Sequence, residues 1–291
     1  MASNIASGLA RIGISVIAGL ASGIDTAAHW ACLEAPDRTP VTDPAAEARR
    51  SLRAAAGGYL RNAVRRPGVT CAVCCTPVDG FERCWRCQRN AASHGLADVV
   101  VPLTYALGGT QSATLLWHYK DDPVHKVRQQ HALIINWLLY LAMSEHERCI
   151  GVAAGMPVSL RVAIPSMSGR TGVHPFTALA RRMNAVNDSA ALLPAPGAVC
   201  DRAVSGDKFL LQPAVPLDGQ HVMVLDDTWT TGSNAQSAAV TLRRAGAARV
   251  SVIVVGRWLS PGYGKTGRFI EEYLQNDFDT DLCPVTGGAC P

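Results

Sequence analysis

Two adjacent aspartates, Asp226 and Asp227, come directly before a group of small residues that carry hydroxyls or no side chain. That group consists of Thr228, Thr230, Thr231, Gly232 and Ser233. Carboxylates accept hydrogen bonds from sugar hydroxyls, whereas hydroxyl and backbone N–H groups donate to phosphate oxygens. Residues of both kinds in one short stretch predict a pocket for a sugar phosphate.

The flanking segments indicate how this stretch is positioned. The apolar run 222–225 is typical of a strand buried on both faces of a parallel sheet. Open α/β sheets bind ligands at the carboxyl ends of their strands. The helix predicted over 234–245 would point its free N–H groups and positive dipole end at an anion. The alternative is a surface turn in which one threonine or serine caps the helix.

The stretch 222–233, read VMVLDDTWTTGS, resembles the phosphoribosyltransferase signature. The resemblance implies a type I phosphoribosyltransferase-like α/β fold, with a mostly parallel sheet flanked by helices. It also implies that Asp226 and Asp227 hold the ribose hydroxyls of phosphoribosyl pyrophosphate, bound with Mg²⁺, while residues 228–233 hold its 5-phosphate. The implied reaction is phosphoribosyl transfer to a nitrogen acceptor.

A second anion-binding loop is expected after the strand predicted at 160–165. In the resembled family a loop in this place binds pyrophosphate, which implies Ser166, Ser168, Gly169 and Arg170 here. Small residues let the backbone approach an anion, and a guanidinium can form two bonds to phosphate oxygens. A plain turn is the alternative. The irregular stretch 187–219 is expected to be a lid, with Lys208 reaching the pyrophosphate.

Four cysteines have the spacing of metal ligands: Cys71, Cys74, Cys84 and Cys87. Two Cys-x2-Cys pairs supply four thiolates, which suit a closed structural Zn²⁺ site in a small hairpin. Free thiols or two disulfides are the alternatives. Because thiolate metal sites are typical of reducing compartments, we expect a cytoplasmic protein. Cys283 and Cys290, near the end of the chain, receive no assignment.

The cysteine pairs are followed by a predicted strand, 98–107, and a predicted helix that precedes Lys120. This order resembles the ComF family of phosphoribosyltransferase-like proteins, to which Tyr105 and Lys120 correspond loosely. The resemblance implies a link to DNA uptake in natural transformation. It leaves a non-catalytic binding module and a sensor of phosphoribosyl pyrophosphate as alternatives to an enzyme.

A glycine-rich turn, AGLASGID at 18–25, lies between a predicted strand and a predicted helix. Such a turn is typical of a phosphate-binding corner. The sequence resembles a short part of the DprA family, whose domain is Rossmann-like. Only about 35 residues carry the resemblance, so we expect a partial Rossmann-like leader without DprA activity of its own.

Residues 36–48 are rich in proline and predict a linker. Six arginines follow without an acidic residue among them: Arg49, Arg50, Arg53, Arg61, Arg65 and Arg66. They indicate either a solvated linker helix or a surface for single-stranded DNA or for DNA-uptake proteins.

Composition sets the limits for these hypotheses. The chain has 291 residues, of which 48% are hydrophobic and 17% charged, as expected for an ordered globular protein. The net charge of +4 is too small to indicate nucleic-acid binding. The apolar stretch 132–143 is too short to span a membrane and predicts a buried helix. We therefore divide the chain into a leader (1–35), a linker and basic segment (36–66), a zinc hairpin (67–95) and a phosphoribosyltransferase-like domain (96–291).

Overall fold

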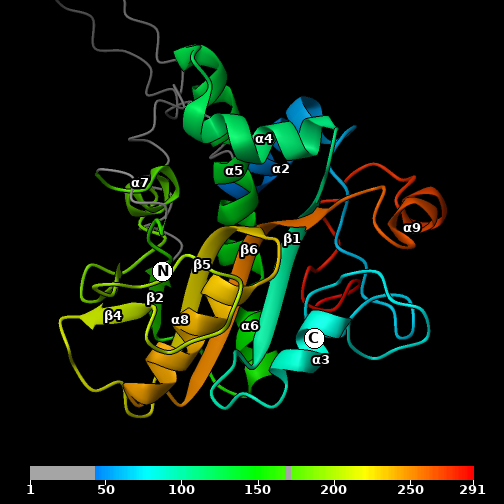
Figure 1. Cartoon of the computed structure of the whole chain (residues 1–291). Helices are drawn as coiled ribbons and strands as arrows, with labels where there is room; N and C mark the ends of the chain where they lie inside the picture. The colour runs from blue at the N-terminus through cyan, green and yellow to red at the C-terminus, as the bar shows by residue number, and fades with distance from the viewer. Residues whose placement is uncertain (1–42, 168–171) are drawn as a thin grey trace, which may run out of the picture.

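The computed structural model describes residues 43–167 and 172–291 (Figure 1). The helices and strands follow in the order α2 (Pro44–Ala56), α3 (Trp85–Asn90), β1 (Val99–Leu107), α4 (Gln111–Asp121), α5 (His125–Glu145), α6 (Glu147–Ala154), β2 (Leu160–Ala163), α7 (Pro175–Arg182), β3 (Ala191–Pro194), β4 (Phe209–Gln212), β5 (His221–Trp229), α8 (Ser233–Arg244), β6 (Arg249–Leu259) and α9 (Thr266–Tyr273).

Four parallel strands form the central sheet in the order β1-β6-β5-β2. The strand predicted from the apolar run 222–225 is the central strand β5, and α8 connects it to the other central strand, β6. β5 extends further than expected, through Trp229, because Thr228 still pairs with Gly256 of β6. The α/β fold with a parallel sheet between helices is confirmed.

The two faces of the sheet are covered by different elements, since alternate residues of a strand point to opposite sides. Met223 and Leu225 of β5 share a core with the helices α2, α4, α5 and α7. Val222 and Val224 share another core with α8, the β3-β4 hairpin and the cysteine-rich hairpin. Figure 1 shows α8 in front of the sheet and α6 behind it. Carboxylates at the end of β5 can therefore face two different environments.

The helix predicted from the apolar stretch 132–143 is confirmed as part of α5, with most of its residues from Ile134 to Met143 buried. Nowhere in residues 43–167 and 172–291 is there a helix with the length and apolar character that crossing a bilayer demands.

The stretch 187–219 differs from the expected irregular lid. β3 and β4 pair within it as an antiparallel hairpin, and Leu192 and Phe209 are buried in the core beside α8. The Lys208 side chain is also buried, and its Nζ lies 2.7 Å from an Asp201 carboxylate oxygen and 2.9 Å from the Asp201 carbonyl. Lys208 is thus bonded within this hairpin and not extended toward a ligand.

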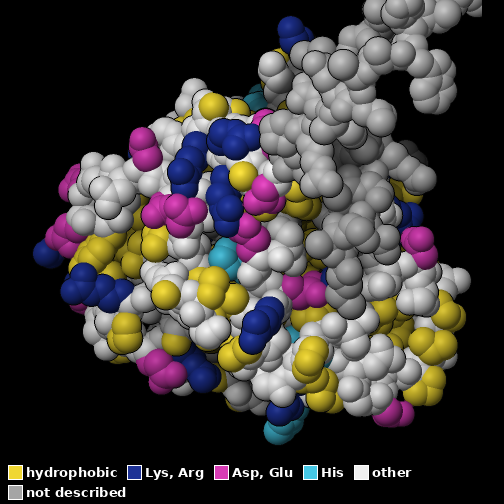
Figure 2. All heavy atoms as spheres, turned by 180° about the vertical axis from the view of Figure 1, so that it is seen from behind, with side chains coloured by type: hydrophobic (Ala, Val, Ile, Leu, Met, Phe, Trp, Pro, Cys, Tyr) yellow, Lys and Arg dark blue, Asp and Glu magenta, His cyan; other side chains and the backbone are white. Residues whose placement is uncertain are grey.

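The arginine-rich segment is packed, so the interpretation as a solvated linker helix does not hold. Ala48, Leu52 and Ala56 form the buried face of α2, which packs against α5. The arginines reach the C-terminal tail: Arg53 Nη2 lies 2.9 Å from an Asp281 carboxylate oxygen, and Arg65 Nε donates to the Pro284 carbonyl at 2.7 Å. On the face seen in Figure 2, basic and acidic side chains are intermingled.

Docking of α2 can be tested by truncating its buried leucine. Leu52 is fully buried, so Leu52→Ala should lower the free energy of unfolding by about 2–5 kcal/mol, as for other core leucines. The matched control is Leu210→Ala, because Leu210 is 51% exposed and should change stability by less than about 0.5 kcal/mol. Denaturant titration measures both values. Equal effects of the two variants would contradict the docking of α2.

Candidate functional site

Asp227 forms the centre of a polar cluster at the carboxyl end of β5. It extends the row of Met223 and Leu225, which faces α4, and is itself buried. Tyr119 Oη donates to Asp227 Oδ2 at 2.5 Å, and Lys120 Nζ lies 2.5 Å from the same oxygen. Two consecutive residues of α4 thus hold one carboxylate of the predicted acidic pair.

Asp226 lies in a different environment on the other face of the strand. It is half-buried, and its Oδ1 accepts a hydrogen bond of 2.9 Å from the Asp227 N–H. Burial, followed by the neighbouring Asp227 charge, holds the pKa of Asp226 well above its ordinary value. Burial also disfavours the Asp227 anion, but the Lys120 ammonium and the Tyr119 hydroxyl outweigh it and lower the pKa of Asp227. The pair therefore combines a stable anion with a carboxyl that readily holds a proton.

The turn between β5 and α8 depends on a glycine. Gly232 has φ 76°, and a Cβ atom there would lie 2.0 Å from the buried indole of Trp229. Only glycine combines this left-handed backbone with so close a contact. Thr231 Oγ1 donates to Ser233 Oγ at 3.2 Å and accepts a hydrogen bond of 3.4 Å from the Ser233 N–H, the first of α8. The N-cap residue, Gly232, has no side chain to cap the helix, so the N–H groups of Asn234 and Ala235 remain available to an anion.

The buried guanidinium of Arg257, near the end of β6, holds the turn between β5 and α8 by hydrogen bonds to its carbonyls. Arg257 Nη1 donates to the carbonyls of Trp229 at 2.7 Å and Thr230 at 2.9 Å. Its Nε donates to Thr76 Oγ1 at 3.0 Å, and Thr76 Oγ1 lies 3.0 Å from Cys74 Sγ. A guanidinium can only donate, so the Thr76 hydroxyl accepts from Arg257 and keeps its own hydrogen for the sulfur. This chain of bonds connects the cysteine-rich hairpin to the turn after β5.

A cleft of ≈ 460 Å³ lies at this edge of the sheet, and its lining includes Lys120, His174, Thr228 and Thr230. Lys120 lines the cleft and also pairs with Asp227, so a ligand in the cleft would meet the ammonium of that ion pair. A neighbouring cavity of ≈ 390 Å³ lies between β2, α7 and β3, and His174 also lines that space. The two cavities together could hold a ligand with two unlike parts.

The second predicted loop is described only in part. Ser166 lines the ≈ 390 Å³ cavity. Ser168, Gly169 and Arg170 lie outside the described residues, so the pyrophosphate loop stays a prediction.

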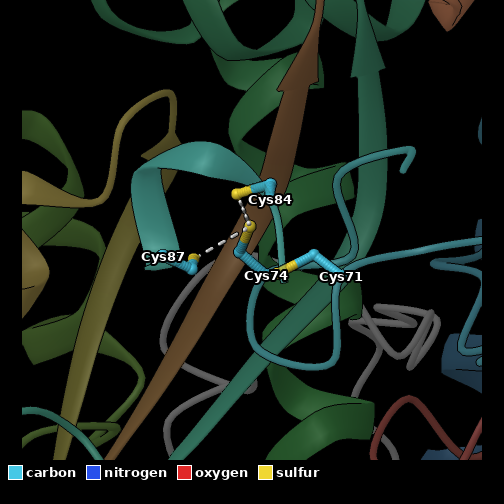
Figure 3. Close-up of side chains that lie close together, drawn as sticks. All are labelled: Cys71, Cys74, Cys84 and Cys87. Atoms are coloured by element: carbon cyan, nitrogen blue, oxygen red, sulfur yellow. Dashed lines mark hydrogen bonds between the residues drawn. The ribbon is translucent and has the colours of Figure 1, made fainter. Parts of the chain in front are cut away.

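The four cysteines of the predicted metal site converge, as Figure 3 shows. The four Sγ atoms all lie within 4.8 Å of one another; they belong to Cys71, Cys74, Cys84 and Cys87. Cys74 Sγ lies 3.7 Å from Cys84 Sγ and 3.5 Å from Cys87 Sγ. Tetrahedral zinc with bonds of about 2.3 Å requires sulfurs about 3.8 Å apart, so the residues present fit this metal. The cluster could hold a metal ion such as zinc.

Cys75, next to the cluster in sequence, is not part of it. It has φ 56° and is fully buried, and burial raises the pKa of its thiol. Its carbonyl accepts a 2.8 Å hydrogen bond from Tyr105 Oη. Tyr105 therefore lies in the core beside the hairpin, whereas Lys120, the other residue loosely matched to ComF proteins, lies at the cleft.

Sequence reasoning missed three residues at this site: Tyr119, His174 and Arg257. Tyr119 could have been found from its position, because it is adjacent to Lys120 in the helix predicted after the strand 98–107. Arg257 had a signal too, because it ends an apolar run of β6 that otherwise contains no charge from Val250 onward.

Asp226 and Asp227 should affect stability in opposite directions. Asp226→Asn removes a carboxylate that burial disfavours, so the free energy of unfolding at pH 7 should rise by about 0.5–1 kcal/mol. Asp227→Asn breaks the bond to Lys120 and should lower that free energy by about 1–3 kcal/mol.

The pH dependence of these stability changes follows from the raised pKa of Asp226 and the lowered pKa of Asp227. The penalty of ionised Asp226 exists above its raised pKa and disappears as the pH falls toward about 4, the ordinary pKa of the unfolded carboxyl. The advantage of Asp226→Asn should shrink over the same window. The contribution of Asp227 is present above that ordinary pKa and is lost at lower pH. Denaturant titrations from about pH 2 to pH 8 measure both windows, with exposed Asp188→Asn as the control. Losses of similar size in both variants would contradict the asymmetric environment.

Comparisons with known proteins identify a relationship for the leader alone. The family model of DNA recombination-mediator protein A matches residues 1–42, which confirms the resemblance to DprA at 18–25 and links that segment to DNA processing. No curated protein matches the chain. The matched segment lies outside the described residues, whereas the acidic pair, the cleft and the cysteine cluster lie in the part of the chain that follows it.

Proposed function

We propose that the edge of the sheet beside β5 binds phosphoribosyl pyrophosphate together with Mg²⁺. The observation that carries this proposal is the position of Asp226 and Asp227 near the carboxyl end of the buried parallel strand β5, shortly before the N-terminus of α8. Carboxylates for the ribose and N–H groups for the phosphate then meet at one edge of the sheet. The ≈ 460 Å³ cleft provides room for the ligand.

Each part of the ligand has a partner in this proposal. The ribose hydroxyls donate to the acidic pair, and the 5-phosphate binds Thr230, Thr231 and Ser233 at the start of α8. The pyrophosphate binds the loop after β2, through Ser166, Ser168, Gly169 and Arg170. Mg²⁺ prefers oxygen ligands, which Asp226, Asp227 and the phosphate oxygens supply. When bound, Mg²⁺ neutralises charge that develops on the pyrophosphate.

The proposed reaction is phosphoribosyl transfer to a nitrogen nucleophile. The bond between C1 of the ribose and the pyrophosphate oxygen breaks, and a bond from C1 to the nitrogen forms, with the proton of the nitrogen released. Asp226 and Asp227 position the sugar for this displacement. The Arg170 side chain stabilises charge on the leaving pyrophosphate.

The cysteine cluster has a structural task in the same proposal. Zn²⁺ bound by Cys71, Cys74, Cys84 and Cys87 would fix Thr76 beside Cys74, and Thr76 accepts from Arg257. Arg257 in turn holds the carbonyls of the turn after β5. The metal thereby supports the shape of the phosphate turn without touching the ligand.

Calorimetric titration with the magnesium complex of phosphoribosyl pyrophosphate tests the proposal. Asp226→Ala/Asp227→Ala removes the acceptors of the ribose hydroxyls, so affinity should fall by about 100-fold or more relative to wild type. Glu271→Ala is a matched control, because Glu271 is an exposed carboxylate on α9, and it should bind like wild type. Ribose 5-phosphate alone should bind more weakly at the same site. Failure of the wild-type chain to bind the complex would refute the proposal.

A second candidate function is the binding of single-stranded DNA, and the surface of the cysteine-rich hairpin favours it. Phe81 and Trp85 are 68% and 63% exposed. The guanidinium carbons of Arg86 and Arg89 lie 5.1 and 5.2 Å from the centre of the Trp85 ring. Exposed aromatic rings with neighbouring cations are the usual surface for unpaired bases and their phosphates. The match of residues 1–42 to a DNA-processing family points the same way.

Fluorescence anisotropy with an oligothymidine tests this second function on the full chain. Trp85→Ala should weaken binding by about 5- to 150-fold, the contribution of one stacked base. Arg86→Gln/Arg89→Gln should reduce the slope of log affinity against log salt by about 1.4, or 0.7 for each phosphate contact. Exposed Tyr263→Ala and Arg148→Gln are the controls and should leave the affinity and the slope unchanged. Unchanged DNA affinity in both hairpin variants would exclude this surface.

A further inference from the structure

A second group of metal-ligating side chains contains none of the residues that line the cleft, and it joins two distant parts of the chain. It contains His146 at the junction of α5 and α6, Cys149 in the first turn of α6, and Cys283 and Cys290 in the C-terminal tail. One ligand atom of each residue lies within 4.8 Å of those of the other three. Neither Cys283 nor Cys290 has a metal-binding spacing with another cysteine, so the fold alone brings this group together.

The distances within the group fit tetrahedral coordination. His146 Nδ1 lies 3.5 Å from Cys290 Sγ and 4.0 Å from Cys149 Sγ. A tetrahedral zinc ion with a Zn–S bond of about 2.3 Å and a Zn–N bond of about 2.0–2.1 Å separates nitrogen and sulfur by about 3.6 Å. Three thiolates and one imidazole are a usual ligand set for structural zinc. The first cysteine cluster has similar separations, from 3.5 to 3.7 Å.

The tail is folded so that its two cysteines face this junction. The Cys283 N–H donates to the Gly288 carbonyl at 2.8 Å, and the Gly287 N–H donates to the Cys283 carbonyl at 2.8 Å. Gly287 has φ 78°, and a Cβ atom there would lie 3.1 Å from the Cβ of Arg65. Because this tight turn reverses the chain, Cys290 returns to the side of Cys283.

Burial and the state of the thiols also favour a metal over a disulfide. His146, Cys149 and Cys283 are buried, whereas Cys290 is exposed and closes the group from the outside. All three cysteines are free thiols. Three thiols cannot all be paired in disulfides among themselves, but three thiolates and an imidazole complete one tetrahedral metal site.

We propose that His146, Cys149, Cys283 and Cys290 form a second structural zinc site, which fastens the C-terminal tail to the α5-α6 junction. The tail also contacts the body through polar links such as Arg53 to Asp281 and Asn62 to the Asp279 carbonyl, and through Phe278 and Val285, which pack against the core. One metal ion with ligands more than 130 positions apart in the chain closes a long loop. This site is independent of the proposed ligand at the cleft.

Metal analysis of the full-length chain, purified in the presence of zinc and a reductant, tests the site. Wild type should contain two zinc ions per chain and Cys290→Ser one. Cys84→Ser, which removes a ligand of the hairpin cluster, should also contain one, and the double variant none. Cys200→Ser is the control, because Cys200 is an exposed thiol outside both groups, and it should keep two. One zinc in wild type that is unchanged in Cys290→Ser overturns the proposal.

A second pair of variants keeps the test decisive if serine substitution harms folding. His146→Cys retains four ligands and should keep two metal ions, whereas His146→Asn should keep one. With Co²⁺ in place of zinc, His146→Cys should also shift the visible bands toward those of a four-thiolate site. An unshifted spectrum would contradict ligation by His146. Mass spectrometry under the same reducing conditions should show no disulfide from Cys149, Cys283 or Cys290, and the finding of one overturns the metal assignment.

Metal loss should also free the tail. The tail has cleavage sites for a protease specific for acidic residues at Asp277, Asp279 and Asp281. Cleavage there should be about tenfold faster in Cys290→Ser or after chelation than in the zinc-loaded wild type, because protection follows local stability. Equal cleavage rates would show that no metal holds the tail.

Discussion

The arrangement of the site depends on one buried guanidinium. Arg257 is 7% exposed, and such a charge is stable in the interior only if its donors are bonded. Its partners come from three places: the turn after β5, the end of β6 and the cysteine-rich hairpin. The hydrogen bonds that stabilise the buried Arg257 charge therefore also fix the turn after β5 relative to the cysteine-rich hairpin. Displacement of either one would leave buried donors without acceptors.

The two aspartates illustrate how strand geometry separates chemically identical side chains. Adjacent residues of β5 point to opposite faces of the sheet, so the Asp227 carboxylate pairs with the Lys120 ammonium, whereas the half-buried Asp226 carboxyl accepts a hydrogen bond from the Asp227 N–H and feels the neighbouring Asp227 charge. Their pKa values shift apart as a result. A ligand that supplies cations or hydroxyl donors to Asp226 would relieve this unfavourable burial. Removal of the free-energy cost of the buried Asp226 carboxylate would then contribute to the binding free energy.

Local patterns predicted the strands β1, β2 and β5, the long α5 helix and the hairpin cysteines, because each signal lies within a few consecutive residues. The acidic pair was found for the same reason. The sequence did not predict the roles of Arg257 and Tyr119 or the group of His146, Cys149, Cys283 and Cys290. The partners of these residues lie far away in the sequence, and only the fold brings them together. The packing of α2 was also missed: its three buried residues stand among arginines, and the acidic partners of those arginines lie in the C-terminal tail. Functional interpretation of the cleft still rests on the resemblance of residues 222–233 to phosphoribosyltransferases.

The contact between Trp229 and Gly232 has an evolutionary consequence. The indole occupies the space that any side chain at 232 would need, so position 232 cannot vary while the tryptophan remains. A homologous chain with a small residue at 229 would lose this clash, and the left-handed backbone at 232 could then accept asparagine, whereas a chain that keeps tryptophan must keep glycine. Substitutions at the two positions should therefore be correlated among homologues. A pair of this kind allows the turn to be recognised in chains whose acidic residues have been replaced.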